Sequence, residues 1–66
     1  MLNYRDPDWL ANAKAIAGLS TGQLAKAAGL SRSTVQRLAN GDDPTLTTFR
    51  KIEDVVIASV SRRAAA

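Results

Sequence analysis

The sequence has neither cysteine nor histidine among its 66 residues. Without cysteine, no disulfide can stabilise a small fold and no thiolate can bind a metal. Without histidine, the chain lacks the commonest general base and the commonest metal ligand. The adjacent carboxylates Asp42 and Asp43 lie between Gly41 and Pro44, a setting typical of a turn. We therefore expect a protein that is not an enzyme and that needs no metal, cofactor or small-molecule ligand.

Long hydrophobic runs are also missing, since no stretch approaches the roughly 18 apolar residues of a membrane span. The first residues, MLNYRDPDW, carry Pro and Asp where a signal peptide needs an apolar run, so we expect a cytoplasmic protein. Positive charge is in excess, with 9 Lys and Arg against 6 Asp and Glu, a net charge of +3. This balance favours nucleic acid or an anionic membrane as a partner. Arg62 and Arg63 are too few to indicate a membrane-surface helix, so we expect no membrane partner.

Apolar residues recur at spacings of three and four along the chain, which predicts an all-α fold. The length allows one domain, residues 1–66, with a thin core. The first helix is expected to be capped by Asp6, with Pro7 at its first position and Asp8 in its first turn, and to end at Gly18. Its expected inner face consists of Trp9, Leu10, Ala13, Ile16 and Ala17.

Two short helices are expected next. Ser20 begins the first of them and Gln23 follows three residues later, which predicts a capping box. Gly29 is expected to end that helix in the left-handed conformation. Ser31 caps the following helix, which is expected to end at Asn40-Gly41. The expected inner residues are Leu24, Ala25 and Ala28 in the first of these helices, and Val35 and Leu38 in the second.

The last predicted helix is capped by Thr45 and begins at Leu46. No glycine or proline follows Pro44, so this helix is expected to run to about Arg62, with residues 63–66 frayed. Glu53 falls within its inner arc and must either reach the edge of the core or pair with a cation. The expected inner stripe is Leu46, Phe49, Ile52, Val56 and Val60. The chain is thus predicted to form a small four-helix bundle.

The segment TGQLAKAAGLSRSTVQRLAN, about residues 21–40, predicts two helices joined by a sharp turn. Ala25 is small enough for a close helix crossing, Gly29 lets the chain reverse, and Leu30 can fill the corner. Only Val35 and Leu38 hold the second helix to the first. The rest of that second helix is therefore available to a partner.

This skeleton resembles the helix-turn-helix of the phage repressor/Cro-type family, also called the XRE family. The resemblance covers roughly residues 19–56: LS before the unit, the Ala-Gly-Val-Leu spacing, NG after it, and P-T-L-x-T-F-x-K-I beyond. It implies a lambda-repressor-like fold whose recognition helix, residues 32–39, lies in the major groove of double-stranded DNA. Two departures are visible. The loop after NG is acidic, whereas in many relatives it is basic. The fourth helix continues without the glycine that commonly precedes a fifth helix in relatives, so we expect four helices.

The resemblance also implies roles for individual residues. Base edges would be contacted by Arg32, Ser33 and Arg37, with Gln36 on the same exposed side. Arg can donate two hydrogen bonds to guanine, and Gln can recognise adenine in the same way. The DNA backbone would be contacted by Thr21, Asn40 and, from the first helix, Lys14. The alternatives are an ordinary solvated face, first-turn roles for Thr21 and Ser33, and a helix-stop role for Asn40.

Val55, with Ala58 and Ser59 nearby, is expected to form a small outward apolar edge on the last helix. Because one module reads only a few base pairs, we expect a homodimer through this edge. The predicted function is sequence-specific regulation of transcription, as a repressor on an operator, with the protein associated with the nucleoid when it is bound to DNA. The resemblance implies a regulator of phage, prophage or small bacterial operon type. The alternative is an antitoxin or adaptor that binds a partner protein through the same scaffold.

Overall fold

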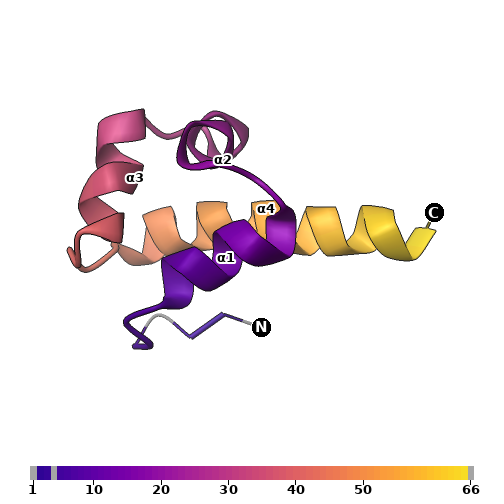
Figure 1. Ribbon diagram of the computed structural model, residues 1–66, viewed down its shortest axis with the longest axis horizontal. Helices are drawn as coiled ribbons and strands as arrows, with labels where there is room; N and C mark the ends of the chain where they lie inside the picture. The colour runs from indigo at the N-terminus through magenta and orange to yellow at the C-terminus, as the bar shows by residue number, and fades with distance from the viewer. Residues whose placement is uncertain (1, 4, 66) are drawn as a thin grey trace.

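The computed structural model describes residues 2–3 and 5–65, and in this part of the chain it contains four helices and no strand (Figure 1). The predicted all-α class is therefore confirmed. α4 forms the long axis of the molecule, and its last turns extend beyond α1 (Figure 1). α1 and α2 pack on α4, while α3 packs mainly on α2. The helices are α1 (Trp9–Ala17), α2 (Thr21–Ala28), α3 (Arg32–Ala39) and α4 (Leu46–Ala65).

The core combines residues from all four helices. Trp9 of α1 lies against Phe49 of α4, with 5.2 Å between ring centroids and an interplanar angle of 56°. This tilted aromatic pair joins the first and last helices. The largest side chains with no meaningful exposure are Leu24, Val35, Ile52 and Val56. Because α2, α3 and α4 each contribute to that set, α3 is held in a fixed position relative to the long helix.

The N-terminal boundary of α1 differs from the prediction. The carboxylate of Asp6 accepts a hydrogen bond from the amide of Asp8 at 2.9 Å, which closes a local turn containing Pro7. The helix then begins at Trp9, after Asp8, whose side chain forms no capping hydrogen bond. The predicted cap at Asp6 and the helical positions of Pro7 and Asp8 were therefore wrong. The carboxylate of Asp6 accepts from the amide of Asp8 in this turn and therefore does not cap α1.

The other predicted helix starts are confirmed. Ser20 and Gln23 form a reciprocal capping box, with hydrogen bonds of 3.3 Å and 3.0 Å. The hydroxyls of Ser31 and Thr45 each accept a hydrogen bond from the amide three residues later, both at 3.2 Å. Each cap satisfies a backbone donor that a helix start would otherwise leave unpaired.

The inner stripe of α4 differs from the prediction at both ends. Leu46 is 67% exposed, Val60 is only half-buried, and Ser59 is buried. The observed stripe follows Phe49, Ile52, Val56 and Ser59. Spacings of three and four alternate in this stripe, so it stays on one face, whereas the predicted step of four to Val60 drifts around the helix. Ile16 of α1, also predicted to lie inside, is half-buried against the core.

The end of α4 is also more regular than expected. The guanidinium group of Arg63 lies against Gly18, the residue that ends α1. Its Nη2 atom would be 3.1 Å from a Cβ added to that glycine. A positive charge at the C-terminal end of α1 is favourable for the helix dipole. α4 extends to Ala65, three residues beyond the predicted end at about Arg62, while the fraying expected for residues 63–66 stays a prediction; Ala66 lies outside the described residues. Glu53 is half-buried at the edge of the core, the first of its two predicted alternatives.

Candidate nucleic-acid interface

The turn between α2 and α3 is closed by Gly29, whose φ of 70° confirms the predicted left-handed conformation. Its amide donates to the carbonyl of Lys26 at 3.2 Å, and the amide of Leu30 donates to the carbonyl of Ala25 at 2.8 Å. These two hydrogen bonds define a Schellman motif. Leu30 is half-buried against the core, so the turn is fixed by packing as well as by backbone hydrogen bonds.

α3 has one buried side and one open side. Val35 and Leu38 are its buried residues, and both were predicted to dock it. The four residues predicted to contact bases are all exposed: Arg32, Ser33, Gln36 and Arg37. This side carries two guanidinium groups and one carboxamide, which are suited to hydrogen bonding with base edges.

Ser33 takes part in a hydroxyl cluster at the start of α3. The Oγ atom of Ser31 lies 3.3 Å from that of Ser33 and 2.7 Å from Oγ1 of Thr34. The hydroxyl of Ser33 therefore has a partner inside the protein. This arrangement agrees with the alternative in which Ser33 is a first-turn residue, and it leaves the two arginines and Gln36 as the longer side chains of the open face.

Two residues predicted to contact the DNA backbone are joined directly. The Nζ atom of Lys14 on α1 donates a 2.9 Å hydrogen bond to Oγ1 of Thr21 at the start of α2. Both residues line a shallow hollow of about 580 Å³ together with Arg32 of α3. Backbone N–H groups at a helix N-terminus and neighbouring cations suit a phosphate group. The hollow thus combines the predicted backbone contacts with one end of the predicted base-reading helix.

Lys26 belongs to the same hollow, although the sequence had not indicated it as a site residue. It lies four residues after Gly22, which also lines the hollow, so the two share a face of α2. Gly22 has no side chain, and an added Cβ would meet no atom within 4 Å. Lys26 is itself exposed. Its positive charge in α2 was the available signal.

The opposite end of α3 has a different character. Asn40 caps this end of the helix, and its amide donates to the carbonyls of Gln36 and Arg37 at 3.1 Å each. Its side chain is exposed, and the preceding residue, Ala39, lines a hollow of about 130 Å³ together with Lys14. The helix-stop alternative for Asn40 is therefore supported by the backbone geometry.

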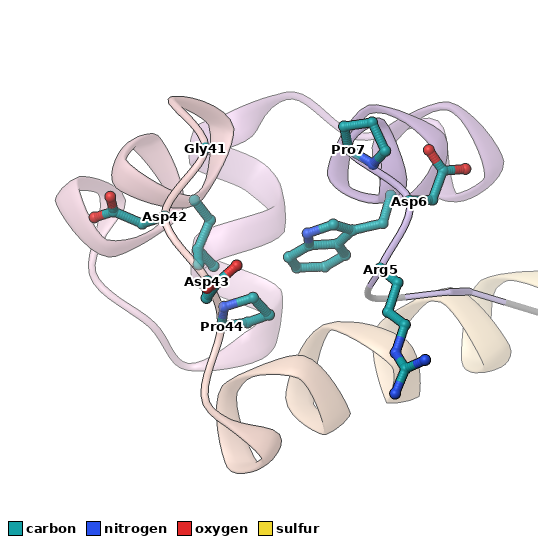
Figure 2. Close-up of a pocket in the computed structure, with 9 residues that line it drawn as sticks. Arg5, Asp6, Pro7, Gly41, Asp42, Asp43 and Pro44 are labelled. Atoms are coloured by element: carbon teal, nitrogen blue, oxygen red, sulfur yellow. The ribbon is translucent and has the colours of Figure 1, made fainter.

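A second hollow, of about 500 Å³, lies between the segment before α1 and the loop between α3 and α4 (Figure 2). Figure 2 shows the carboxylates of Asp6 and Asp42 pointing away from it on opposite sides. In the part of the chain that the structure describes, no three acidic, histidine or cysteine side chains are grouped to hold a metal ion. Over the same residues, no helix is both long enough and apolar enough to cross a membrane.

The outward apolar edge predicted on α4 is not observed. Val55 is half-buried and packs against the core, and Ser59 is buried, where its Oγ accepts a hydrogen bond from Nη2 of Arg62 at 3.4 Å. Only Ala58 of the three predicted interface residues is exposed. The basis for that pairing surface was therefore wrong, because α1 and α2 both pack on α4 and widen its buried arc.

Two short helices joined at a left-handed glycine, the second with one open side, define a helix-turn-helix domain. The helix-turn-helix family HTH_3 matches residues 12–56, and the chain belongs to this family. A protein of Archaeoglobus fulgidus, named as a candidate HTH-type transcriptional regulatory protein, is 41% identical to it over 51 residues. The match covers 77% of this chain and 16% of the relative, so the chain corresponds to a small part of that protein. No solved structure matches the chain.

Proposed function

We propose that this domain binds double-stranded DNA in a sequence-specific manner and serves a transcriptional regulator. The open side of α3 carries the proposal. That side exposes Arg32, Gln36 and Arg37 while Val35 and Leu38 hold the helix to the core. A short helix with this arrangement can enter the major groove and hydrogen-bond to base edges. The net charge of +3 favours association with a polyanion.

The hollow at the start of α2 would then hold the DNA backbone. Lys14 and Thr21 are already hydrogen-bonded there, so an arriving phosphate meets a positioned ammonium group. Lys26 adds a further cation, and the N-terminus of α2 adds backbone N–H donors. Contacts of this kind fix the orientation of the protein on the duplex and carry no sequence information. Arg32 borders both this hollow and the open side of α3.

We further propose that the regulator represses transcription by occupying an operator as a homodimer. The support is the size of the reading element, since α3 has 8 residues and reaches only a few base pairs. Two copies would place their recognition helices about 34 Å apart, one turn of DNA. Sedimentation velocity with and without operator DNA tests this. A single copy per duplex at high protein concentration would overturn the dimer without affecting DNA binding.

The central experiment selects binding sites from a random-sequence DNA pool, followed by mobility-shift titration. An enriched motif supports sequence-specific binding. Failure to bind any duplex at low salt would overturn the proposal, because electrostatic attraction to phosphates is strongest under those conditions. A protein that co-purifies under the same conditions would then favour the antitoxin or adaptor alternative.

Variants separate base reading from backbone contact. Arg32→Ala and Arg37→Ala should each weaken binding to the selected site by about 1–3 kcal/mol and relax the preference at one position. Lys14→Ala should weaken binding to every sequence alike and lower the salt dependence by about one phosphate contact. Arg50, exposed on α4, provides a matched control in which a positive charge is removed elsewhere. Equal losses on selected and scrambled DNA would make the two α3 arginines backbone contacts.

A further inference from the structure

The end of α3 is closed by the same backbone motif as the end of α2. The amide of Gly41 donates to the carbonyl of Leu38, and the amide of Asp42 donates to the carbonyl of Arg37, both at 3.1 Å. Gly41 has a φ of 106°. These features define a second Schellman motif, in which the residue after the glycine folds back over the helix turn five residues earlier.

This motif makes Asp42 and Arg37 side-chain neighbours. The corresponding two positions often form a hydrophobic contact in such motifs. At the end of α2 they are Leu30 and Ala25, which fit that pattern. At the end of α3 they are a carboxylate and a guanidinium. The backbone geometry therefore places residues of opposite charge at neighbouring positions of one hollow, at the exposed end of the proposed reading helix.

The surroundings of this pair leave room for contact, although the two side chains are not paired in the free chain. Arg37 and Asp42 line one hollow of about 200 Å³, and both are exposed. Figure 2 shows the carboxylate of Asp42 directed away from the hollow beside the segment before α1. In the free chain, no carboxylate of the described residues lies within ion-pair distance of Arg37. An exposed pair gains little in water, because solvent screening and side-chain entropy oppose it.

We propose that Asp42 is a positioning residue for Arg37 and thereby a determinant of DNA sequence preference, an inference that rests on the proposed function. Docking in the groove excludes water and strengthens the attraction between the two charges. A carboxylate that accepts from one edge of a guanidinium restricts its rotation. The remaining N–H donors are then presented in a fixed plane to guanine. Partial neutralisation also makes Arg37 a weaker partner for phosphate.

A double-mutant cycle tests the inference. The quantity measured is the ratio of dissociation constants for the selected site and for the single base-pair variant whose discrimination depends on Arg37. Uniform electrostatic changes cancel in this ratio. Asp42→Asn should lower the ratio about fivefold, within the range of coupling between contacting residues. The same change in an Arg37→Ala background should leave the ratio unaltered.

Asp54→Asn is the matched control, since it removes one exposed carboxylate on α4 and should leave the ratio unchanged. Thermal unfolding of each variant confirms that the fold is retained. If Arg37→Ala relaxes the preference but Asp42→Asn does not, or if Asp42→Asn acts equally in both backgrounds, the positioning role is overturned alone. If Arg37→Ala itself leaves the preference unchanged, base reading by this residue fails and the inference falls with it.

Discussion

The turn after α2 and the loop after α3 contain the same backbone motif, the Schellman motif, but differ in the side chain that follows the glycine. In both, a glycine with positive φ is followed by a residue whose amide returns to the helix, Leu30 in one case and Asp42 in the other. Leu30 is half-buried against the core, whereas Asp42 is exposed. The backbone motif ends a helix in either case. The side chain after the glycine decides whether the turn packs inward or faces solvent.

This difference teaches how a domain with a thin core divides its surface. α3 must be held on one side and left open on the other. The turn that enters α3 uses an apolar residue to anchor it, and the loop that leaves α3 uses a charged residue where no anchor is needed. The end of α1 resembles the end of α2. There, Leu19 follows Gly18, its amide donates a hydrogen bond to the carbonyl of Lys14, and its side chain is half-buried. The acidic loop is thus the exception in this chain.

The largest loss of stability is expected when the apolar residue after the glycine, Leu30, is replaced by an acidic one. Leu30→Asp is expected to lower the free energy of unfolding by about 3 kcal/mol, because buried apolar area is lost and a carboxylate is partly desolvated. Urea denaturation measures this change through the transition midpoint. A loss below about 1 kcal/mol would mean that Leu30 does not anchor the turn.

The shared backbone motif can be tested at the two glycines. Gly29→Val and Gly41→Val should each cost roughly 1–2 kcal/mol, since an added Cβ meets no atom within 4 Å and the penalty is conformational. Gly22 is the control, because it lies inside α2 without a positive φ and also has open space around it. Gly22→Ala should stabilise the domain by about 0.5–1 kcal/mol. Thermal unfolding monitored by circular dichroism distinguishes these opposite signs.

The helix starts after the two connections should respond alike. Ser31→Ala and Thr45→Ala each remove a hydroxyl that accepts a 3.2 Å hydrogen bond from a backbone amide. Each change is expected to cost about 1 kcal/mol. Chemical denaturation of both variants in parallel measures the pair, and Ser61→Ala, at an exposed position in α4, is the control. Clearly unequal losses would show that the loops, and not the caps, set the strength of these helix starts.

The smallest effect on stability is expected at the acidic loop. Asp42→Leu should change the free energy of unfolding by no more than about 0.5 kcal/mol, because the side chain is exposed and anchors nothing. Denaturation under the conditions used for Leu30→Asp gives the direct comparison. A large loss would assign Asp42 a structural role and would make the two connections equivalent after all.

Most features set by neighbouring residues, though not the start of α1, were predicted correctly from the sequence. The capping box of Ser20 and Gln23 depends on residues three positions apart, and Gly29 depends on its own backbone preference. Asp6 shows the limit of this reasoning, because two local hydrogen-bonding patterns competed for the same carboxylate. Nothing in the spacing of residues near Asp6 decided which pattern would form.

Features that depend on tertiary packing were predicted less well. The buried arc of α4 is set by the helices that cover it, so Leu46 was wrongly placed inside and Ser59 wrongly placed outside. The exposure of the α3 face was predicted, since Val35 and Leu38 defined its inner side. The hydrogen bond between Lys14 and Thr21 was not, because it depends on how α1 and α2 pack.

Under the proposed function, the length of α3 also limits how much DNA sequence one copy of the domain can recognise. Its 8 residues span about 12 Å, and base pairs stack about 3.4 Å apart, so one helix faces about four base pairs. A four-letter word carries about eight bits and recurs by chance about every 250 base pairs, among roughly a million or more competing sites. Two recognition helices on one site would double the number of recognised base pairs. The average spacing between chance matches would then be squared. Under the proposed function, the number of domain copies bound at one site therefore sets the length of the recognised DNA sequence. The strength of any single contact matters less for that length.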